Sequence, residues 1–538
     1  MSELRLETVF NTLADCGWDK ENRRNCLAFS AEEDKAHEEF KGFVDQLKTL
    51  ADEKGLNVFF ESDVFGNSYA ILEGDNDEEI VVCSHLDSVI NGGRFDGVVG
   101  VATGLNLIQR YIKEGLKPKY NIRVAAFRAE ESSITGYSCL GSSLATGVAD
   151  ESKLRKKKLN GHYLSLHDFL RVKSGHEEVI QNGPFLNGNK IRAVFEVHTE
   201  QSAVLERLDR GVGVVVKGIG GSRRSDLNIL DNRAVKNSIG EAGRMLKRLR
   251  ITSHGTAGHT GGLPMNGEII LGEELKLRKD AVIKMMELLS ALDPGGFLVS
   301  LNVPEGAYNT VPEKCVAEFL VHDDFDMNTH KLYLGSLFSG HKDIEMEIIS
   351  NDEVEEITYI SDNVRNAAVE LIIAVDDIAG SLAMATNGEV RATVSKISSA
   401  NGVLTLGIDE RRLDEETGND LTKIIEETRE ELAKKYDVLF EEENVVDTKS
   451  TPLSDDLSAI IRSTYVNLFE EEPVEIGSMP SHDAAKVIRC NGEENLIPGA
   501  MIFVRSLNGG ISHHPAELCD IDDMTQASIL LYETIKKV

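Results

Sequence analysis

An ordered series of three apolar segments near the start of the chain constrains the fold most. Residues 80–83 form a short β-rich run, residues 97–113 place apolar side chains at helical spacing, and residues 121–127 form a second β-rich run. Strand, helix and strand at this spacing predict a βαβ unit. Such units build α/β domains with a mixed, mostly parallel sheet and helices on both faces, and functional sites lie at the carboxyl ends of the strands.

The middle of the chain contains a weak internal repeat. Residues 277–325 and 364–413 share the same predicted order of helix, turn, strand, asparagine-containing loop and strand. Two unrelated helix-and-hairpin units are the alternative, but the matching order and similar lengths favour a duplication.

The predicted layout is therefore a catalytic α/β domain in two pieces, with a second, α+β domain inserted between them. The pieces are residues 1–211 and 419–538, and the insert is residues 212–418. Within the insert, the two repeats are expected at 250–325 and 345–413, with approximate bounds.

The composition excludes several classes of partner. The chain has 58 Lys and Arg against 90 Asp and Glu, a net charge of −32, so it lacks the positive surface that nucleic acids and anionic membranes require. No apolar stretch approaches the ~18 residues of a transmembrane helix, and the first residues do not resemble a signal peptide. The seven scattered cysteines include no C-x-x-C pair, which is typical of reduced thiols. We expect a cytoplasmic protein.

Two candidate metal ligands lie around the first predicted strand. His85 and Asp87 follow that strand at alternate positions, so both side chains point to the same side and the carboxylate can accept the second N–H of the imidazole. A capped turn explains the pair equally well. Asp96 lies in a glycine-rich loop just before the predicted helix, where it either caps the helix or bridges two cations.

Further candidates follow other predicted strands. Glu130 and Glu131 end the strand 121–127, and because adjacent side chains diverge, one can bind a metal while the other addresses a water. His198 and His513 each close or follow a strand. Histidines and carboxylates without thiolates suit Zn²⁺, Mn²⁺ or Co²⁺ in an open catalytic site. A carboxylate shared by two ligand sets is the arrangement of a two-metal hydrolase.

These motifs, in this order, resemble those of the co-catalytic metallohydrolases of the aminoacylase and carboxypeptidase family. The branch that they resemble holds N-carbamoyl-L-amino-acid hydrolases, allantoate amidohydrolases and β-ureidopropionases. The matching segments are residues 84–97, 130–131, 198–201, 258–261, 481–484 and 510–517.

The resemblance implies two divalent metal ions in one active site. His85, Asp96 and His198 would hold one ion, and Asp96, Glu131 and His513 would hold the other, with Asp96 as the bridge.

It also assigns roles to four residues that are not ligands. Glu130 would be the general base that takes a proton from the water. Asp87 would orient His85, and Gln201 would contact the amide or ureido end of the substrate. His482 would be a substrate-binding or supporting residue, although helix capping by its neighbours is nearly as good an explanation.

The inserted domain resembles the lid of the family, in which a His and an Asn from the lid of a partner subunit commonly complete the active site. These correspond to His259, as a catalytic residue, and Asn309, as a substrate-binding residue. The Arg that holds the substrate carboxylate is replaced by His322 in the first repeat but is present as Arg411 in the second. We hypothesise that the duplicated lid divides these roles and makes the chain monomeric. The alternative is a homodimer in which the insertion has no role in the site and His322 has replaced the carboxylate-binding Arg.

The implied activity is hydrolysis of a linear amide or ureido C–N bond in a small anionic substrate that bears a carboxylate, such as an N-carbamoyl-amino acid or an allantoate-like ureide. A dipeptidase or aminoacylase-type deacylase would share the same metals and base. A non-catalytic binding protein of the same fold is a remote alternative.

Overall fold

The structure is a computed structural model that divides into two compact units. Unit 1 comprises Met1–Ile219 and Thr451–Val538, and unit 2 comprises Gly220–Ser450. The structure describes residues 4–538 except 160–162, 176–184, 233–237, 240–244, 261–262, 264, 266–268, 271–272, 275–277, 292–295, 305–309, 323–324, 330–342, 354–356 and 387.

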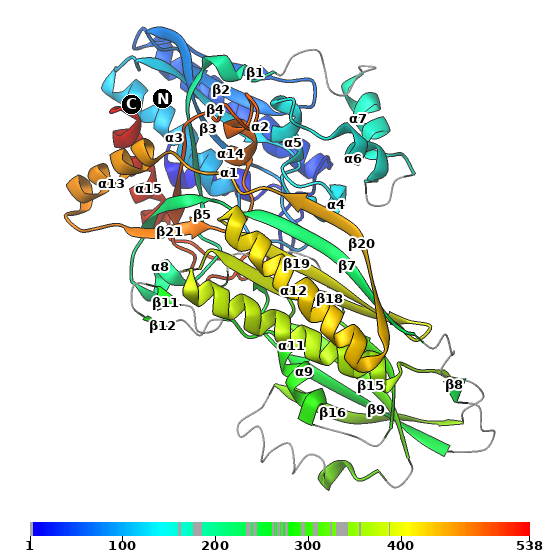
Figure 1. The fold of residues 1–538 in the computed structure, drawn as a ribbon. Coiled ribbons are helices and arrows are strands. Elements are labelled where there is room, and N and C mark those ends of the chain that lie inside the picture. Colours follow the sequence, from blue (N-terminus) through cyan, green and yellow to red (C-terminus); the bar gives the residue numbers. More distant parts are fainter. Residues whose placement is uncertain are drawn as a thin grey trace. The chain divides into compact units, whose positions relative to one another are not determined.

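Unit 1 is built on an eight-stranded mixed sheet with the order β1-β2-β4-β3-β5-β22-β6-β21 (Figure 1). The four central strands, β4, β3, β5 and β22, are parallel to one another, and β1 and β2 pair antiparallel with their neighbours. Strand β6 pairs antiparallel with β22 and parallel with β21. The strands are β1 (Val58–Ser62), β2 (Ser68–Leu72), β3 (Asn76–His85), β4 (Tyr120–Phe127), β5 (Ile191–Thr199), β6 (Val212–Ile219), β21 (Val474–Ser478) and β22 (Gly499–Val504).

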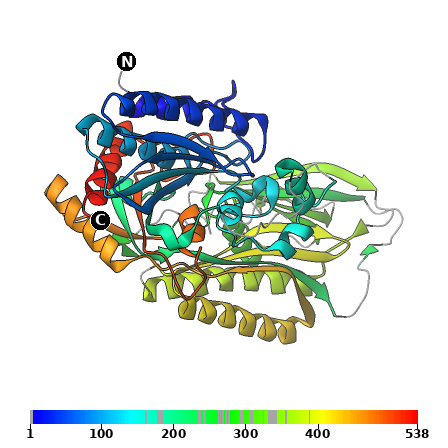
Figure 2. The same ribbon diagram turned by 90° about the horizontal axis from the view of Figure 1, so that it is seen from above.

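Helices cover both faces of this sheet, as the α/β prediction requires. The apolar side of α3 packs against alternate residues of β3, including Ile80 and Val82, together with α1, α2, α13 and α15. Figure 2 shows the N-terminal helices lying over the sheet. On the opposite face, α14 and α5 contact each other, and α14 contacts β3 and β5. The helices are α1 (Leu6–Ala14), α2 (Ala31–Asp52), α3 (Val98–Glu114), α4 (Ser132–Thr135), α5 (Leu140–Ala145), α6 (Glu151–Lys156), α7 (Leu166–Ser174), η1 (Gly188–Lys190), α8 (Val204–Arg207), α13 (Asp455–Phe469), α14 (Asp483–Ile488) and α15 (Ile521–Ile535).

Unit 2 contains two four-stranded antiparallel sheets with the same topology. The outer copy consists of β7 (Gly221–Asp231), α11 (Asp362–Ala385), β18 (Val390–Ala400), β19 (Val403–Arg412), α12 (Glu415–Tyr436) and β20 (Val438–Thr448). The nested copy consists of β9 (Met245–His254), α9 (Ala281–Ala291), β13 (Phe297–Asn302), β15 (Lys314–His322), a helical stretch at 327–329 and β16 (Ile344–Glu353). When the strands of each copy are counted along the chain, both sheets have the order second, third, first, fourth.

The two copies meet through equivalent elements. The second strands of the copies, β13 and β18, adjoin: the Val303 N–H donates to the Ile397 carbonyl (2.9 Å) and the Ser399 N–H donates to Asn302 Oδ1 (3.2 Å). The first helices, α9 and α11, contact each other inside one continuous apolar core. Contact of like with like is how identical subunits meet about a two-fold axis.

Short two-stranded ladders complete unit 2. They pair β8 (Ser238–Ile239) with β17 (Ile357–Thr358), β10 (Gly258–His259) with β14 (Thr310–Val311), and β11 (Ile269–Ile270) with β12 (Glu273–Glu274).

The observed boundaries differ from the expected insert of 212–418. Strand β6 belongs to unit 1 because it pairs with β22, and α12 and β20 belong to unit 2 because β20 pairs with β7. The expected repeats also lay in series, whereas the nested copy lies between β7 and α11 of the outer copy.

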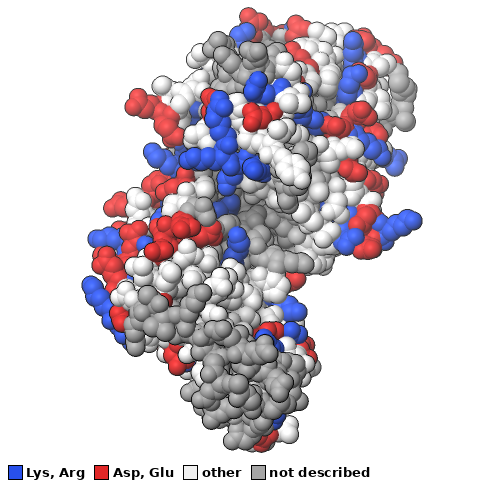
Figure 3. Space-filling view, turned by 90° about the vertical axis from the view of Figure 1, so that its right-hand side faces the viewer, with Lys and Arg blue, Asp and Glu red and all other residues white. Residues whose placement is uncertain are grey.

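The described helices and the charged side chains on the surface can be compared with the expectations for membrane and nucleic-acid binding. No described helix has the length and apolar character that a membrane crossing needs. On the face drawn in Figure 3, acidic and basic side chains are interspersed.

Candidate metal centre

The five predicted metal ligands lie together at the carboxyl ends of the parallel strands in unit 1. His85 ends β3, Glu131 follows β4, His198 lies near the end of β5, and His513 lies in the loop after β22. Asp96 comes from the loop between β3 and α3. Because β4, β3, β5 and β22 run in the same direction, their carboxyl ends meet at one edge of the sheet.

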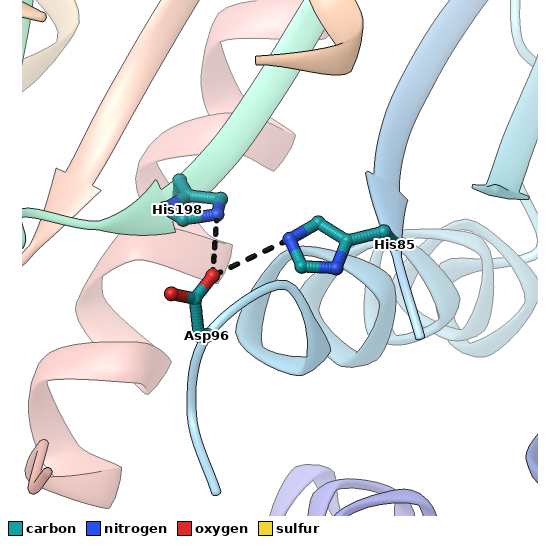
Figure 4. A group of neighbouring side chains, drawn as sticks. All are labelled: His85, Asp96 and His198. Carbon is teal, nitrogen blue, oxygen red and sulfur yellow. Dashed lines mark ion pairs between the residues drawn. The ribbon is translucent and has the colours of Figure 1, made fainter. Parts of the chain in front are cut away.

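The Asp96 carboxylate lies at the middle of this set. Its Oδ1 is 3.3 Å from His85 Nε2 and 3.1 Å from His198 Nε2 (Figure 4). Its Oδ2 is 3.3 Å from His513 Nε2, which is 3.2 Å from Glu131 Oε1. Each carboxylate oxygen therefore faces a different ligand set. The side chains form two groups that could hold a metal ion, one with His85 and His198 and one with Glu131 and His513, and Asp96 belongs to both.

Backbone conformation makes this close approach feasible. Gly97 follows Asp96 with φ of 70°, and a Cβ atom there would lie 2.5 Å from the His85 ring. A side chain at position 97 would push the Asp96 loop away from His85. His513 itself has φ of 58°, a left-handed conformation that is uncommon outside glycine but in which asparagine, aspartate and histidine are enriched.

Asp87 holds the two glutamates more directly than it holds the histidine. Its two carboxylate oxygens accept the backbone N–H groups of Glu130 (2.9 Å) and Glu131 (3.0 Å). His85 Nδ1 is 3.4 Å from Asp87 Oδ1 and 3.3 Å from the Asp87 carbonyl oxygen. The buried carboxylate thus joins the end of β3 to the segment after β4, a link that the H-x-D spacing did not indicate.

Glu130 is buried beside a cysteine that the sequence did not mark as functional. The Cys139 thiol donates to Glu130 Oε1 (2.9 Å), and the Cys139 N–H donates to the Glu130 carbonyl oxygen (2.7 Å). Burial raises the pKa of Glu130 to about 7. A carboxylate with such a pKa can both take up and release a proton near neutral pH.

When no metal is bound, the candidate ligands His198 and His513 are protonated on both ring nitrogens at neutral pH. Burial alone would lower the pKa of His198, but the Asp96 carboxylate raises it to about 9. Burial likewise opposes protonation of His513, but Glu131 and Asp96 raise its pKa to about 9. For Asp96, burial would raise the pKa, but His198 and the other histidines hold it well below its ordinary value. Divalent cations can replace these protons, and the nitrogen and oxygen donors suit Zn²⁺, Mn²⁺ or Co²⁺.

Gln201 lies against the bridging carboxylate. Its Nε2 donates to Asp96 Oδ2 (2.6 Å), and its buried Oε1 has no hydrogen-bond partner within the described part of the chain. The side chain thus offers an unused acceptor beside the metal ligands.

His482 lies behind a ligand. Its ring packs on the His198 ring, with centroids 4.5 Å apart, and its Nε2 contacts Ser478 Oγ (2.7 Å). Burial lowers the pKa of His482 well below its ordinary value, so the ring is neutral. No side chain caps α14 at His482; instead Glu196 accepts the Ala484 N–H (2.8 Å).

The predicted lid residues lie in unit 2. Arg411 is buried on β19, and its Nε lies 2.9 Å and 3.1 Å from the two carboxylate oxygens of Asp409. Asp409 also accepts a hydrogen bond from the Thr260 hydroxyl, and Thr260 follows the buried His259. The nested segment that carries His259 is therefore bonded to the outer strand that carries Arg411.

The remaining lid predictions have different outcomes. His322, the alternative clamp, is exposed at the end of β15. Asn309 lies outside the described residues.

Two candidate ligand groups that share one carboxylate, at the carboxyl edge of an α/β sheet, are the arrangement found in two-metal hydrolases. The chain belongs to the peptidase family M20/M25/M40, whose sequence model matches residues 81–537. The predicted family resemblance is thereby confirmed.

Curated relatives and solved structures agree with this assignment. The chain is 28% identical over 304 residues to a ureidoglycolate hydrolase of Oryza sativa subsp. japonica, covering 55% of each protein. It is 28% identical over 298 residues to an N-carbamoyl-L-amino acid amidohydrolase of Geobacillus stearothermophilus, covering 54% of this chain and 61% of the relative. The match thus spans little more than half the length of these relatives. A hydantoinase/carbamoylase family amidase from Burkholderia ambifaria shares the fold, with a TM-score of 0.59, 18% identity and coverage of 99% of this chain and 97% of that chain.

Proposed function

We propose that the chain is a two-metal amidohydrolase that cleaves a linear amide or ureido C–N bond in a small substrate bearing a carboxylate. The observation that carries this proposal is the Asp96 carboxylate, whose two oxygens face separate ligand groups. The activities named for the rice and Geobacillus relatives support a ureido or N-carbamoyl substrate.

In this proposal His85, Asp96 and His198 hold one divalent ion, and Asp96, Glu131 and His513 hold the other. The ions would supply Lewis-acid polarisation of the scissile carbonyl and a lowered pKa of the attacking water. Asp87 keeps the two glutamates in place through their backbone N–H groups.

Glu130 moves the proton. Its carboxylate takes a proton from the attacking water and delivers it to the leaving nitrogen, and a pKa of about 7 suits both steps. The Cys139 thiol holds one of its oxygens, which restricts the orientation of the carboxylate.

Gln201 is the residue of unit 1 that we assign to substrate binding beside the ions. Its buried Oε1 lacks a partner among the residues described, so an N–H of a substrate would satisfy it. A ureido group carries more N–H donors than a peptide bond, and this supports ureido substrates over dipeptides. His482 packs on His198, which supports a role in fixing that ligand.

We further propose that the lid is duplicated and that its copies divide the substrate-binding roles. The nested copy would supply His259 and Asn309, and the outer copy would supply Arg411 as the clamp for the substrate carboxylate. The shared strand order of the copies and the link from Thr260 to Asp409 to Arg411 support this division.

The duplicated lid also supports a monomeric enzyme. The edge strands β13 and β18 adjoin each other within one chain, so neither is left for a second chain to pair with in the same way. Light scattering of the active protein should give a mass near 59.1 kDa. An active species of twice that mass that loses activity on dissociation would contradict the monomer.

A panel of substrates tests the proposed activity. The metal-free chain is reloaded with Zn²⁺, Mn²⁺ or Co²⁺ and assayed with N-carbamoyl-amino acids, allantoate and dipeptides. Release of ammonia and CO₂ supports the proposal, whereas release of amino acids alone identifies the dipeptidase or deacylase alternative. A chain that binds two ions but turns over none of these compounds would contradict both.

A cytoplasmic location stays a prediction, supported by seven thiols that form no disulfide.

A further inference from the structure

The five candidate ligands are held by two kinds of structure, strands and loops, and Asp96 in a loop belongs to both metal groups. His85 and His198 belong to β3 and β5, which pair with each other and have a further parallel neighbour on their other sides. Asp96 and His513 lie in loops, here called the Asp96 loop (91–97) and the His513 loop (507–517). Strands are fixed by their ladders, whereas loops depend on specific contacts for their position.

A buried carboxylate outside the ligand set connects these two loops. Glu517 Oε2 accepts the backbone N–H groups of Phe95 (2.7 Å) and Asp96 (3.1 Å). Glu517 Oε1 lies 3.0 Å from the Ser512 hydroxyl, which also lies 3.0 Å from Asp96 Oδ2. Since Ser512 directly precedes His513, Glu517 connects the backbone of one ligand with the neighbour of another.

The Asp96 loop is shaped to admit this carboxylate. A Cβ atom on Gly93 would lie 2.4 Å from both Cβ and Oε2 of Glu517. Only a residue without a side chain leaves room for Glu517 against the loop. The Glu517 N–H in turn donates to the His514 carbonyl (3.0 Å), so Glu517 ends a tight turn that begins directly after the ligand His513.

We propose that Glu517 is a positioning residue that fixes the Asp96 and His513 loops relative to each other. The affinity of the Asp96–Glu131–His513 group for its divalent ion then depends on Glu517 more strongly than the affinity of the His85–Asp96–His198 group does. This inference rests on the proposed two-metal function. Loss of a residue that orients metal ligands typically weakens metal affinity by about 10- to 100-fold.

The test measures Zn²⁺ and Co²⁺ binding to the metal-free full chain by competition with a chromophoric chelator. We expect Glu517→Ala to keep one ion with an affinity within about threefold of the unaltered chain and to bind the second about 10- to 100-fold more weakly. Glu517→Gln should restore part of the second affinity, because its amide oxygen still accepts the two N–H groups. A purely structural role predicts no such selective loss.

If Glu517→Ala does not fold, a second variant and a control still test the proposal. Ser512→Ala removes the hydroxyl link and should also weaken only one ion. Asp280→Asn is the matched control, because Asp280 is a buried carboxylate of unit 2 that accepts the Val282 N–H (2.8 Å); it should change neither affinity.

The outcomes separate this inference from the proposed function. Unchanged binding of both ions in Glu517→Ala and Ser512→Ala, or an equal loss of both, overturns the positioning role of Glu517. Failure of the unaltered chain to bind two ions overturns the proposed function itself.

Discussion

Replacement of Asp87 should loosen the segment that carries both glutamates, even without metal. Asp87 is fully buried, and its carboxylate accepts the N–H groups of Glu130 and Glu131, which are also buried. A buried N–H without an acceptor destabilises the structure by about 1–3 kcal/mol. Asp87→Ala removes both acceptors, a loss of about 2–6 kcal/mol, and Asp87→Asn, which keeps one amide oxygen, should lose about half of that.

Hydrogen exchange followed by mass spectrometry measures this effect locally, on chelator-treated protein. A loss of 1–3 kcal/mol per bond corresponds to about 5- to 150-fold faster exchange of the released amide. Peptides that contain Glu130 and Glu131 should therefore exchange faster in Asp87→Asn and faster still in Asp87→Ala, while peptides from α12 should not change. Asp45→Asn, at an exposed site on α2, is the control. Unchanged exchange at both glutamates in Asp87→Ala would refute the reasoning.

Three other predictions concern turnover and metal binding. Glu130→Gln should lower kcat by about 100-fold or more while both ions stay bound, because Glu131 remains; retained turnover in a steady-state assay would remove Glu130 as the base. Raised pKa values of about 9 keep His198 and His513 protonated at pH 7 in the metal-free chain, so metal affinity should rise with pH up to about 9. Calorimetry in two buffers should detect the released protons, and a flat affinity between pH 6 and 9 would contradict those pKa values. Arg411→Gln should raise KM by about 10- to 100-fold, more at low salt, while Arg250→Gln, at a half-buried site on β9, should not; equal KM values would exclude the clamp.

The parts of the site that the sequence predicted are those that follow from periodicity within single strands. His85, Glu131 and His198 come at or just after the ends of β3, β4 and β5, and the alternation of apolar residues located those ends. Parallel strands bring their carboxyl ends to one edge of a sheet, which predicts that these side chains lie near one another. Their division into two ligand groups, with Asp96 as the bridge, came from the family resemblance.

The parts that the sequence did not predict depend on contacts between distant segments. Nothing near Glu517 indicates that its carboxylate accepts the N–H groups of Phe95 and Asp96. Cys139, which has φ of 52°, donates its thiol hydrogen to Glu130, and nothing in its local sequence indicates this contact.

The domain boundaries were missed for the same reason. The apolar run of β6 reads equally well as the last strand of one domain or the first strand of the next. Only its partner β22, which comes from residues 499–504, decides that it belongs to unit 1. Likewise, α12 and β20 follow the second predicted repeat without a break, and only the pairing of β20 with β7 includes them in unit 2.

The nested arrangement of unit 2 places the partners of its first strand far away along the chain. Strand β7 leaves the ribosome early, but its partners β19 and β20 come from residues 403–448, after the whole nested copy. The described strands of the nested sheet pair with one another within residues 245–353, whereas both partners of β7 are synthesised after them. The partner of β6, strand β22, is synthesised later still. A chain truncated before residue 403 would therefore lack both partners of β7, and unpaired strand edges favour aggregation.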